Sequence, residues 1–147
     1  MVKNDTKVFV VYKGIKIDDT KDRPIRRQIE VRPFNNELEY LQGLVEGYLE
    51  HYVIDDGLDR LHIDMWINEE GKFQEGLKPT IALTHEGQLY DVIMGNCVFS
   101  KYNEAGETLG LNPKEMCIVI DWLNDQDIVG LISRDGSPDI PVLKVER

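Results

Sequence analysis

The sequence predicts an α+β domain in which a mostly antiparallel sheet is covered by two helices and followed by a C-terminal hairpin. Short segments that alternate apolar and polar residues at the period of a β-strand follow one another through polar turns. Two other segments carry apolar residues at helical spacing behind a capping signal. The length of 147 residues suits a single domain, residues 1–147, with one hydrophobic core.

Two strands and a helix are expected in the first third of the chain. Residues 7–12 form an apolar run rich in β-branched and aromatic side chains, and residues 25–32 alternate apolar and polar side chains. Residues 14–24 are polar and charged, so we expect a loop there. The first helix should begin with a capping box at Asn36 and end at Gly47, because a left-handed glycine commonly closes a helix.

The middle of the chain predicts further strands. Residues 48–54 and 61–68 should pair as an antiparallel hairpin across the turn signal at residues 55–57. Residues 89–99 are expected to form one apolar strand that is interrupted at Gly95. A glycine inside a strand indicates a bulge or a place where something approaches the backbone closely.

A second helix and a terminal hairpin complete the expected fold. The helix should begin at Asn112, with Pro113 in its first position and Glu115 completing a capping box. Residues 128–145 contain two short apolar segments around a turn, which predicts the C-terminal hairpin.

Charge is divided unevenly along the chain. The formal net charge is −10, yet residues 1–34 carry nine Lys and Arg against five Asp and Glu, and residues 35–147 carry eight against twenty-two. An acidic body repels nucleic acid, so DNA or RNA binding is not expected. The basic N-terminal segment could hold a small anion or the acidic face of a second subunit.

The cellular setting follows from what the sequence lacks. No apolar run is long enough to cross a bilayer, and the N-terminus has no apolar secretory region, so we expect a cytoplasmic protein without membrane contact. Cys97 and Cys117 lie among apolar residues, and we expect both to be buried free thiols.

Three motifs occur in an order that is known from other proteins. They are Gly47-Tyr48-Leu49-Glu50, Asn68-Glu69-Glu70-Gly71-Lys72 and Asp91-Val92-Ile93-Met94-Gly95. With them, residues 28–125 resemble the phage- and plasmid-borne family catalogued as domain of unknown function 3846. Ile67 stands where that family usually has cysteine. The resemblance implies carriage on mobile genetic elements but no particular activity, and small phage accessory proteins often counter host defences.

Recognised catalytic and metal-binding patterns are absent from the sequence. It has no Gly-x-Ser-x-Gly elbow, no Ser-x-x-Lys pair and no glycine-rich phosphate loop. His62 and Asp64 share a strand face, but only the distant His51 or His85 could supply a third metal ligand. A cysteine–histidine dyad is disfavoured because apolar neighbours make a thiol inert. We therefore expect no enzymatic activity, no metal and no cofactor.

The residues favour an anion-binding surface instead. Arg27 lies beside apolar side chains on its strand, and a guanidinium group suits bidentate recognition of phosphate. Trp66 points away from the apolar row of its strand, where a helix, a dimer partner or a stacked purine would cover it. The candidate ligand-binding residues are Arg27, Arg32, Tyr48, Trp66, Asn68, Lys72 and Asn96.

These observations predict a non-catalytic accessory protein of a phage or mobile element. It would act in the host cytoplasm against a defence system by sequestering a small anionic, nucleotide-like signal. The alternative is an acidic inhibitor that occupies the basic nucleic-acid-binding groove of a host defence protein, and a small enzyme that hydrolyses such a signal also stays open. Two short helices leave part of the sheet uncovered, so a homo-oligomer is expected.

Overall fold

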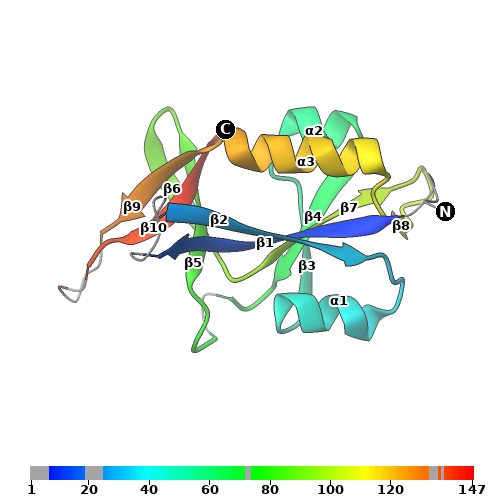
Figure 1. Ribbon diagram of the computed structural model, residues 1–147, viewed down its shortest axis with the longest axis horizontal. Coiled ribbons are helices and arrows are strands. Elements are labelled where there is room, and N and C mark those ends of the chain that lie inside the picture. Colours follow the sequence, from blue (N-terminus) through cyan, green and yellow to red (C-terminus); the bar gives the residue numbers. More distant parts are fainter. Residues whose placement is uncertain (1–6, 19–24, 72–73, 133–135, 137) are drawn as a thin grey trace.

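The computed structural model describes residues 7–18, 25–71, 74–132, 136 and 138–147. Two β-sheets pack together in it, with helices on their faces (Figure 1). Most strand pairs are antiparallel, so the α+β class expected from the sequence is confirmed. The strands are divided between two sheets, where the sequence had predicted one.

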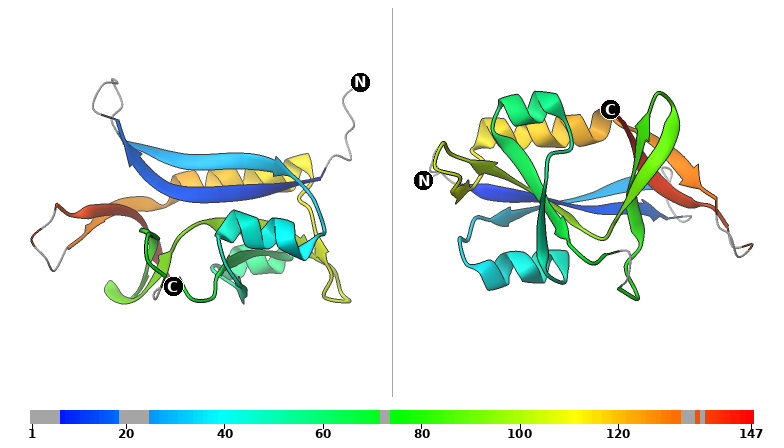
Figure 2. Two further views of the ribbon diagram at one scale, coloured as in Figure 1. Left: turned by 90° about the horizontal axis from the view of Figure 1, so that it is seen from below. Right: turned by 180° about the vertical axis from the view of Figure 1, so that it is seen from behind.

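The larger sheet, sheet A, contains strands from the first three quarters of the chain. Its path is β2-β1-β7-β4-β3, and β8 pairs with β7. These strands are β1 (Val8–Ile17), β2 (Ile25–Pro33), β3 (Leu49–Tyr52), β4 (Ile63–Asn68), β7 (Cys97–Tyr102) and β8 (Thr108–Leu109). The β1–β2 pair forms a long arm that extends toward the second sheet (Figure 2).

The second sheet, sheet B, has the order β6-β5-β10-β9. Its strands are β5 (Pro79–His85), β6 (Gln88–Met94), β9 (Asp127–Leu131) and β10 (Ile140–Glu146). β9 and β10 form the expected C-terminal hairpin, and β10 then pairs in parallel with β5.

The helices lie on the two faces of sheet A. α3 (Pro113–Asp125) and α1 (Leu38–Val45) lie on opposite sides of the central strands in Figure 1. On one side, the buried cluster that includes Val119 and Leu123 of α3 joins apolar residues of both sheets. On the other side, α1 covers a smaller cluster around Phe9 and Val98. A short helix, α2 (Asp56–Arg60), replaces the turn that was expected before β4.

The predicted apolar strand at residues 89–99 is two strands in different sheets. β6 ends at Met94, and β7 begins at Cys97. Gly95 between them has a φ of +85° and donates its N–H to the carbonyl of Lys78 at 2.8 Å. Side chains rarely tolerate that φ, so glycine allows the chain to leave sheet B and enter sheet A here.

Two boundaries differ from the sequence prediction. β1 continues to Ile17 because its second half pairs with β2 after a bulge, where a loop was expected. α1 begins at Leu38 without a side-chain cap, and its left-handed closing residue is Glu46, not Gly47. The capping box at Asn112 of α3 is confirmed, with both reciprocal hydrogen bonds present.

The two cysteines differ in environment. Both are free; Cys97 is buried in the core as expected, but Cys117 is exposed. The prediction for Cys117 was wrong because its apolar neighbours in sequence lie on other faces of α3. Burial raises the pKa of Cys97 to about 12.

We expect the folded protein to react with a thiol reagent at one cysteine only. Cys117 should be modified quickly at pH 8, whereas the pKa of Cys97 leaves only about one thiolate in ten thousand, in a core the reagent does not reach. Titration with Ellman's reagent measures this directly. The Cys117→Ser variant should show no fast reaction until urea unfolds it, and a fast native reaction in that variant would contradict the burial of Cys97.

Candidate functional site

The two arginines expected to bind an anion lie on β2, but their side chains lie on opposite faces of it. Arg27 Nη2 donates to the carbonyl of Gln126, at the end of α3, at 2.6 Å, and its buried Nε has no hydrogen-bond partner among the described residues. Arg32 lies on the α1 side and forms an ion pair with Glu30 at 2.8 Å. The two guanidinium groups therefore do not converge on one ligand.

Of three other predicted residues, two lie near the end of α1 and one lies outside the described residues. Tyr48 follows α1 and is 66% exposed. Asn96 donates from its amide to the carbonyl of Leu44 at 2.9 Å. Lys72 lies outside the described residues.

Asn68 is buried and fully engaged with the protein itself. Its amide nitrogen donates to the carbonyls of Val45 and Glu46, each at 3.2 Å, and to Gln74 Oε1 at 2.9 Å. Its amide oxygen accepts the backbone N–H of Glu70 at 2.8 Å. The last carbonyls of a helix lack partners within the helix, and Asn68 satisfies two of them at the end of α1.

Trp66 lies half-buried on the α1 side of sheet A. Its Nε1 donates to Ser100 Oγ at 3.2 Å, and its ring meets the His51 ring edge-on with centroids 5.2 Å apart. Part of the indole packs against the cluster under α1, and part lines an open hollow. Among the predicted residues that the structure describes, Asn68 alone lines the cavity described next.

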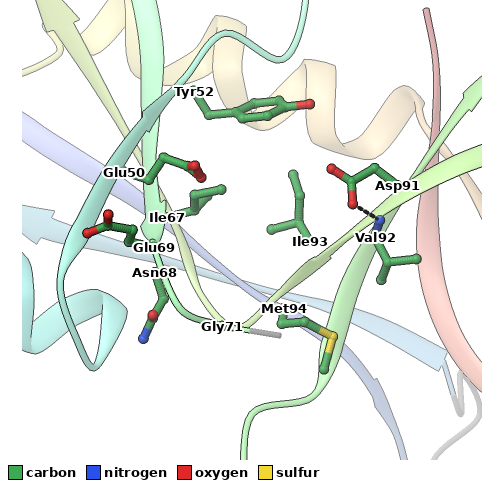
Figure 3. A pocket seen from close by; sticks show the side chains of 10 residues that line it. All are labelled: Glu50, Tyr52, Ile67, Asn68, Glu69, Gly71, Asp91, Val92, Ile93 and Met94. Atoms are coloured by element: carbon green, nitrogen blue, oxygen red, sulfur yellow. Dashed lines mark hydrogen bonds between the residues drawn. The ribbon is translucent and has the colours of Figure 1, made fainter. Parts of the chain in front are cut away.

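The three motifs that carry the family resemblance meet around one cavity between the two sheets (Figure 3). Its volume is about 230 Å³. The lining comes from β3, β4, the turn after β4 and β6: Glu50, Tyr52, Ile67, Asn68, Glu69, Gly71, Asp91, Val92, Ile93 and Met94. Segments that are some twenty residues apart thus form a single structural unit.

The walls of this motif cavity are acidic. Figure 3 shows Glu50 and Glu69 on one side and Asp91 on the other, with the Tyr52 ring at one end. Asp91 Oδ1 also accepts the backbone N–H of Val92 at 2.8 Å. Carboxylates on both walls repel anions and suit a cationic group such as a lysine or arginine side chain.

Packing explains much of the motif pattern. A Cβ atom on Gly71 would lie 3.1 Å from the carbonyl oxygen of Met94, so a larger residue there would require the turn after β4 and β6 to move apart by a few tenths of an ångström. The N–H of Glu69 donates to the carbonyl of Tyr48 at 2.8 Å, which ties the first motif to the second. The motifs therefore hold the two sheets together at their junction.

Metal chemistry has no support at this cavity. Within the described part of the chain, no group of three or more His, Cys, Asp or Glu side chains is placed to hold a metal ion.

The largest of the observed cavities is a lysine-lined cleft between the β1–β2 arm and sheet B. Its volume is about 560 Å³. The lining residues are Lys13, Gly14, Ile15, Lys16, Ile17, Gln28, Lys78, Pro79, Thr80, Asp139, Ile140 and Pro141. The lining thus includes three lysines, against one acidic residue, Asp139.

The lysines of the cleft differ in whether they already form an ion pair. Lys13 forms an ion pair with Glu30 at 3.2 Å, and hydrogen bonds from Arg32 and Lys13 lower the pKa of Glu30. Lys16 and Lys78 are exposed and have no ion-pair partner within the residues the structure describes. These two ammonium groups are available to an incoming anion.

Sequence reasoning did not find these lysines. Lys16 lies where a loop was expected, and Lys13 and Lys78 lie at positions to which no element was assigned. The excess of basic residues before residue 35 was the available signal, but it did not show which of them face a common cleft.

The fold and these cavities define a small two-sheet α+β protein with open cavities between its sheets. A family model described as a domain of unknown function, DUF3846, matches residues 12–124. The chain therefore belongs to the DUF3846 family, and the match begins earlier than the resemblance at residues 28–125 had indicated. No curated protein and no solved structure matches the chain.

From the sequence, we expected no segment that crosses a membrane. Among the helices in the described part of the chain, none is long and apolar enough to cross a membrane.

Replacing Asn68 by alanine should destabilise the protein by about 1–3 kcal/mol, because it leaves buried backbone groups at the end of α1 without partners. Urea unfolding followed by fluorescence measures the loss. The matched control is Asn124→Ala on an exposed position of α3, which should change stability by less than about 0.5 kcal/mol. Equal stability of the two variants would show that Asn68 does not hold the junction.

Proposed function

We propose that this protein is a non-catalytic binding protein that holds a small anionic ligand in the lysine-lined cleft. The observation that carries the proposal is that Lys13, Lys16 and Lys78 line the largest of the observed cavities, in a chain whose net charge is −10. Cations collected in a concave site raise the local concentration of an anion.

The size and lining of the cleft favour a small organic anion over an inorganic ion. A volume of about 560 Å³ falls within the range of about 300–1,000 Å³ that is typical of small-molecule sites. Ile15, Pro79 and Ile140 add apolar surface beside the lysines. Apolar surface next to ammonium groups suits a ligand with both a ring and phosphate groups, which a nucleotide has.

The biological role we propose is sequestration of a nucleotide-like defence signal in the host cytoplasm. Its support is the membership of the DUF3846 family together with the phage and plasmid setting that the family resemblance implies. The family setting favours this role by association, and the role requires that the lysine-lined cleft binds the signal.

Charge reversal in the cleft should abolish ligand binding. We expect ATP and pyrophosphate to bind the unaltered protein, and the Lys16→Glu/Lys78→Glu variant to bind at least about tenfold more weakly, a loss of about 1.4 kcal/mol. Binding should also weaken as salt is raised, because the lysines are exposed. Isothermal titration calorimetry measures both effects.

The control carries the same change in net charge elsewhere. Arg60→Glu/Lys114→Glu places two reversals on exposed helical positions outside the cleft. It should bind like the unaltered protein. Equal losses in both variants would mean that net charge, and not the cleft, governs binding, and absence of saturable binding would refute the proposal.

Sequestration and turnover differ in the fate of the ligand. A sequestering protein releases its ligand chemically unchanged when it is denatured, whereas an enzyme returns a product. Liquid chromatography of the ligand before and after incubation, alongside native mass spectrometry of the complex, distinguishes the two and reports the oligomeric state.

A second function is favoured by the motif cavity. Glu50, Glu69 and Asp91 line it, and they would accept lysine or arginine side chains of a basic partner protein. An inhibitor that occupies a nucleic-acid-binding groove would use this surface. Such an association would be salt-sensitive and would weaken in Glu50→Gln/Glu69→Gln, whereas small-anion binding in the lysine-lined cleft would not.

A further inference from the structure

A separate hollow on the α1 side of sheet A is built from residues of four segments. Its volume is about 230 Å³. The lining residues are His51 of β3, Asp64 and Trp66 of β4, Tyr102 of β7, and Gly106 and Thr108 of the β7–β8 hairpin. None of these residues lines the motif cavity or the lysine-lined cleft.

Strand register places a polar floor between two aromatic side chains. Asp64 lies directly opposite Ser100 in the antiparallel β4–β7 pair, so both side chains point to the same face. Trp66 lies two residues along β4 from Asp64, and Tyr102 lies two residues along β7 from Ser100 in the other direction. Two residues of strand span about 7 Å, so each ring borders the floor on its own side.

A chain of hydrogen bonds orders the floor. Trp66 Nε1 donates to Ser100 Oγ at 3.2 Å, and Ser100 Oγ donates to Asp64 Oδ1 at 3.0 Å. The other carboxylate oxygen, Oδ2, bonds to His51 Nε2. Asp64 is only 4% exposed, and burial raises its pKa, while the bonds from His51 and Ser100 lower it.

The hydrogen bond to Asp64 orients the His51 ring and leaves its other ring nitrogen, Nδ1, for a ligand. In the neutral form of the imidazole, donation from Nε2 to the carboxylate leaves Nδ1 as a hydrogen-bond acceptor. The His51 side chain is 47% exposed, and no residue that the structure describes is hydrogen-bonded to Nδ1. A ligand that enters the hollow can therefore donate a hydrogen bond to this atom.

The aromatic walls are also held in place. Tyr102 donates its hydroxyl to Asp59 Oδ1 at 2.7 Å, and its ring stacks on His62 with centroids 4.9 Å apart. Trp66 is fixed by Ser100 and by packing under α1. Rings that are already ordered lose little conformational entropy when a ligand binds.

We infer that this hollow is a binding site for an uncharged planar heteroaromatic ring, such as a nucleobase. The ring would contact the Trp66 and Tyr102 side chains and donate an N–H to Nδ1 of His51. Every nucleobase has a π-face that can stack on an aromatic side chain. The buried carboxylate beneath disfavours an anion, and its charge is already engaged by two donors, which disfavours a cation.

The size of the hollow is consistent with one ring system. Its volume of about 230 Å³ lies below the range of about 300–1,000 Å³ that is typical of sites for larger small molecules, which favours a single ring system over a whole nucleotide. The inference is independent of the proposed function, because the lysine-lined cleft contributes no residue to it.

Nucleosides test this site because they carry the ring without phosphate. In the Trp122→Phe background, Trp66 is the one remaining tryptophan, since the chain has two. Adenosine, guanosine, cytidine and uridine are titrated while Trp66 fluorescence is recorded. We expect saturable quenching by at least one of them with a Kd below about 1 mM. Calorimetry on the unaltered protein gives the same Kd without relying on the Trp122→Phe variant.

Two variants separate a specific site from general contact. His51→Ala should raise the Kd at least about tenfold, because the ring loses its hydrogen-bond acceptor. His85→Ala alters an exposed histidine on sheet B and should leave the Kd unchanged, as should Lys16→Glu/Lys78→Glu. The inference fails if no nucleoside binds saturably by either method, or if the two histidine variants lose affinity equally.

Discussion

The chain crosses from sheet B to sheet A between Met94 and Cys97, and this crossing brings the two sheets onto a shared core. The left-handed conformation of Gly95 permits the change of direction, and its bond to Lys78 fixes the start of β5 beside it. Tyr12, Ile81 and other buried residues of both sheets then pack in one cluster. The motif cavity and the lysine-lined cleft both lie where the sheets meet, so both depend on this crossing.

Those parts of the fold that rest on neighbours in sequence were predictable. The alternation at residues 25–32, the capping box at Asn112 and the C-terminal hairpin are local patterns, and the structure confirms them. Membership of a sheet is not local. β5 pairs in parallel with β10, about sixty residues away, and no periodicity within either strand indicates its partner. The division into two sheets therefore could not be obtained from alternation alone.

The candidate ligand residues show a related limit. A buried carbonyl group needs a hydrogen-bond donor, and so does a bound ligand. The sequence does not show to which of the two an amide or guanidinium group will donate. Asn68, Asn96 and Arg27 all donate to backbone carbonyls at or just after the ends of helices. Trp66 lines an open hollow, as its position on the polar face of β4 had indicated.

The acidic body and the lysine-lined cleft are compatible because electrostatic interactions in salt solution have a short range. At physiological ionic strength the screening length is about 8 Å, so an anion inside the cleft experiences chiefly Lys13, Lys16 and Lys78. A nucleic acid would extend well beyond that distance and would meet the acidic residues that dominate the chain after residue 34. We therefore expect this charge distribution to favour a short anion over a long one, because screening limits how far each charge acts.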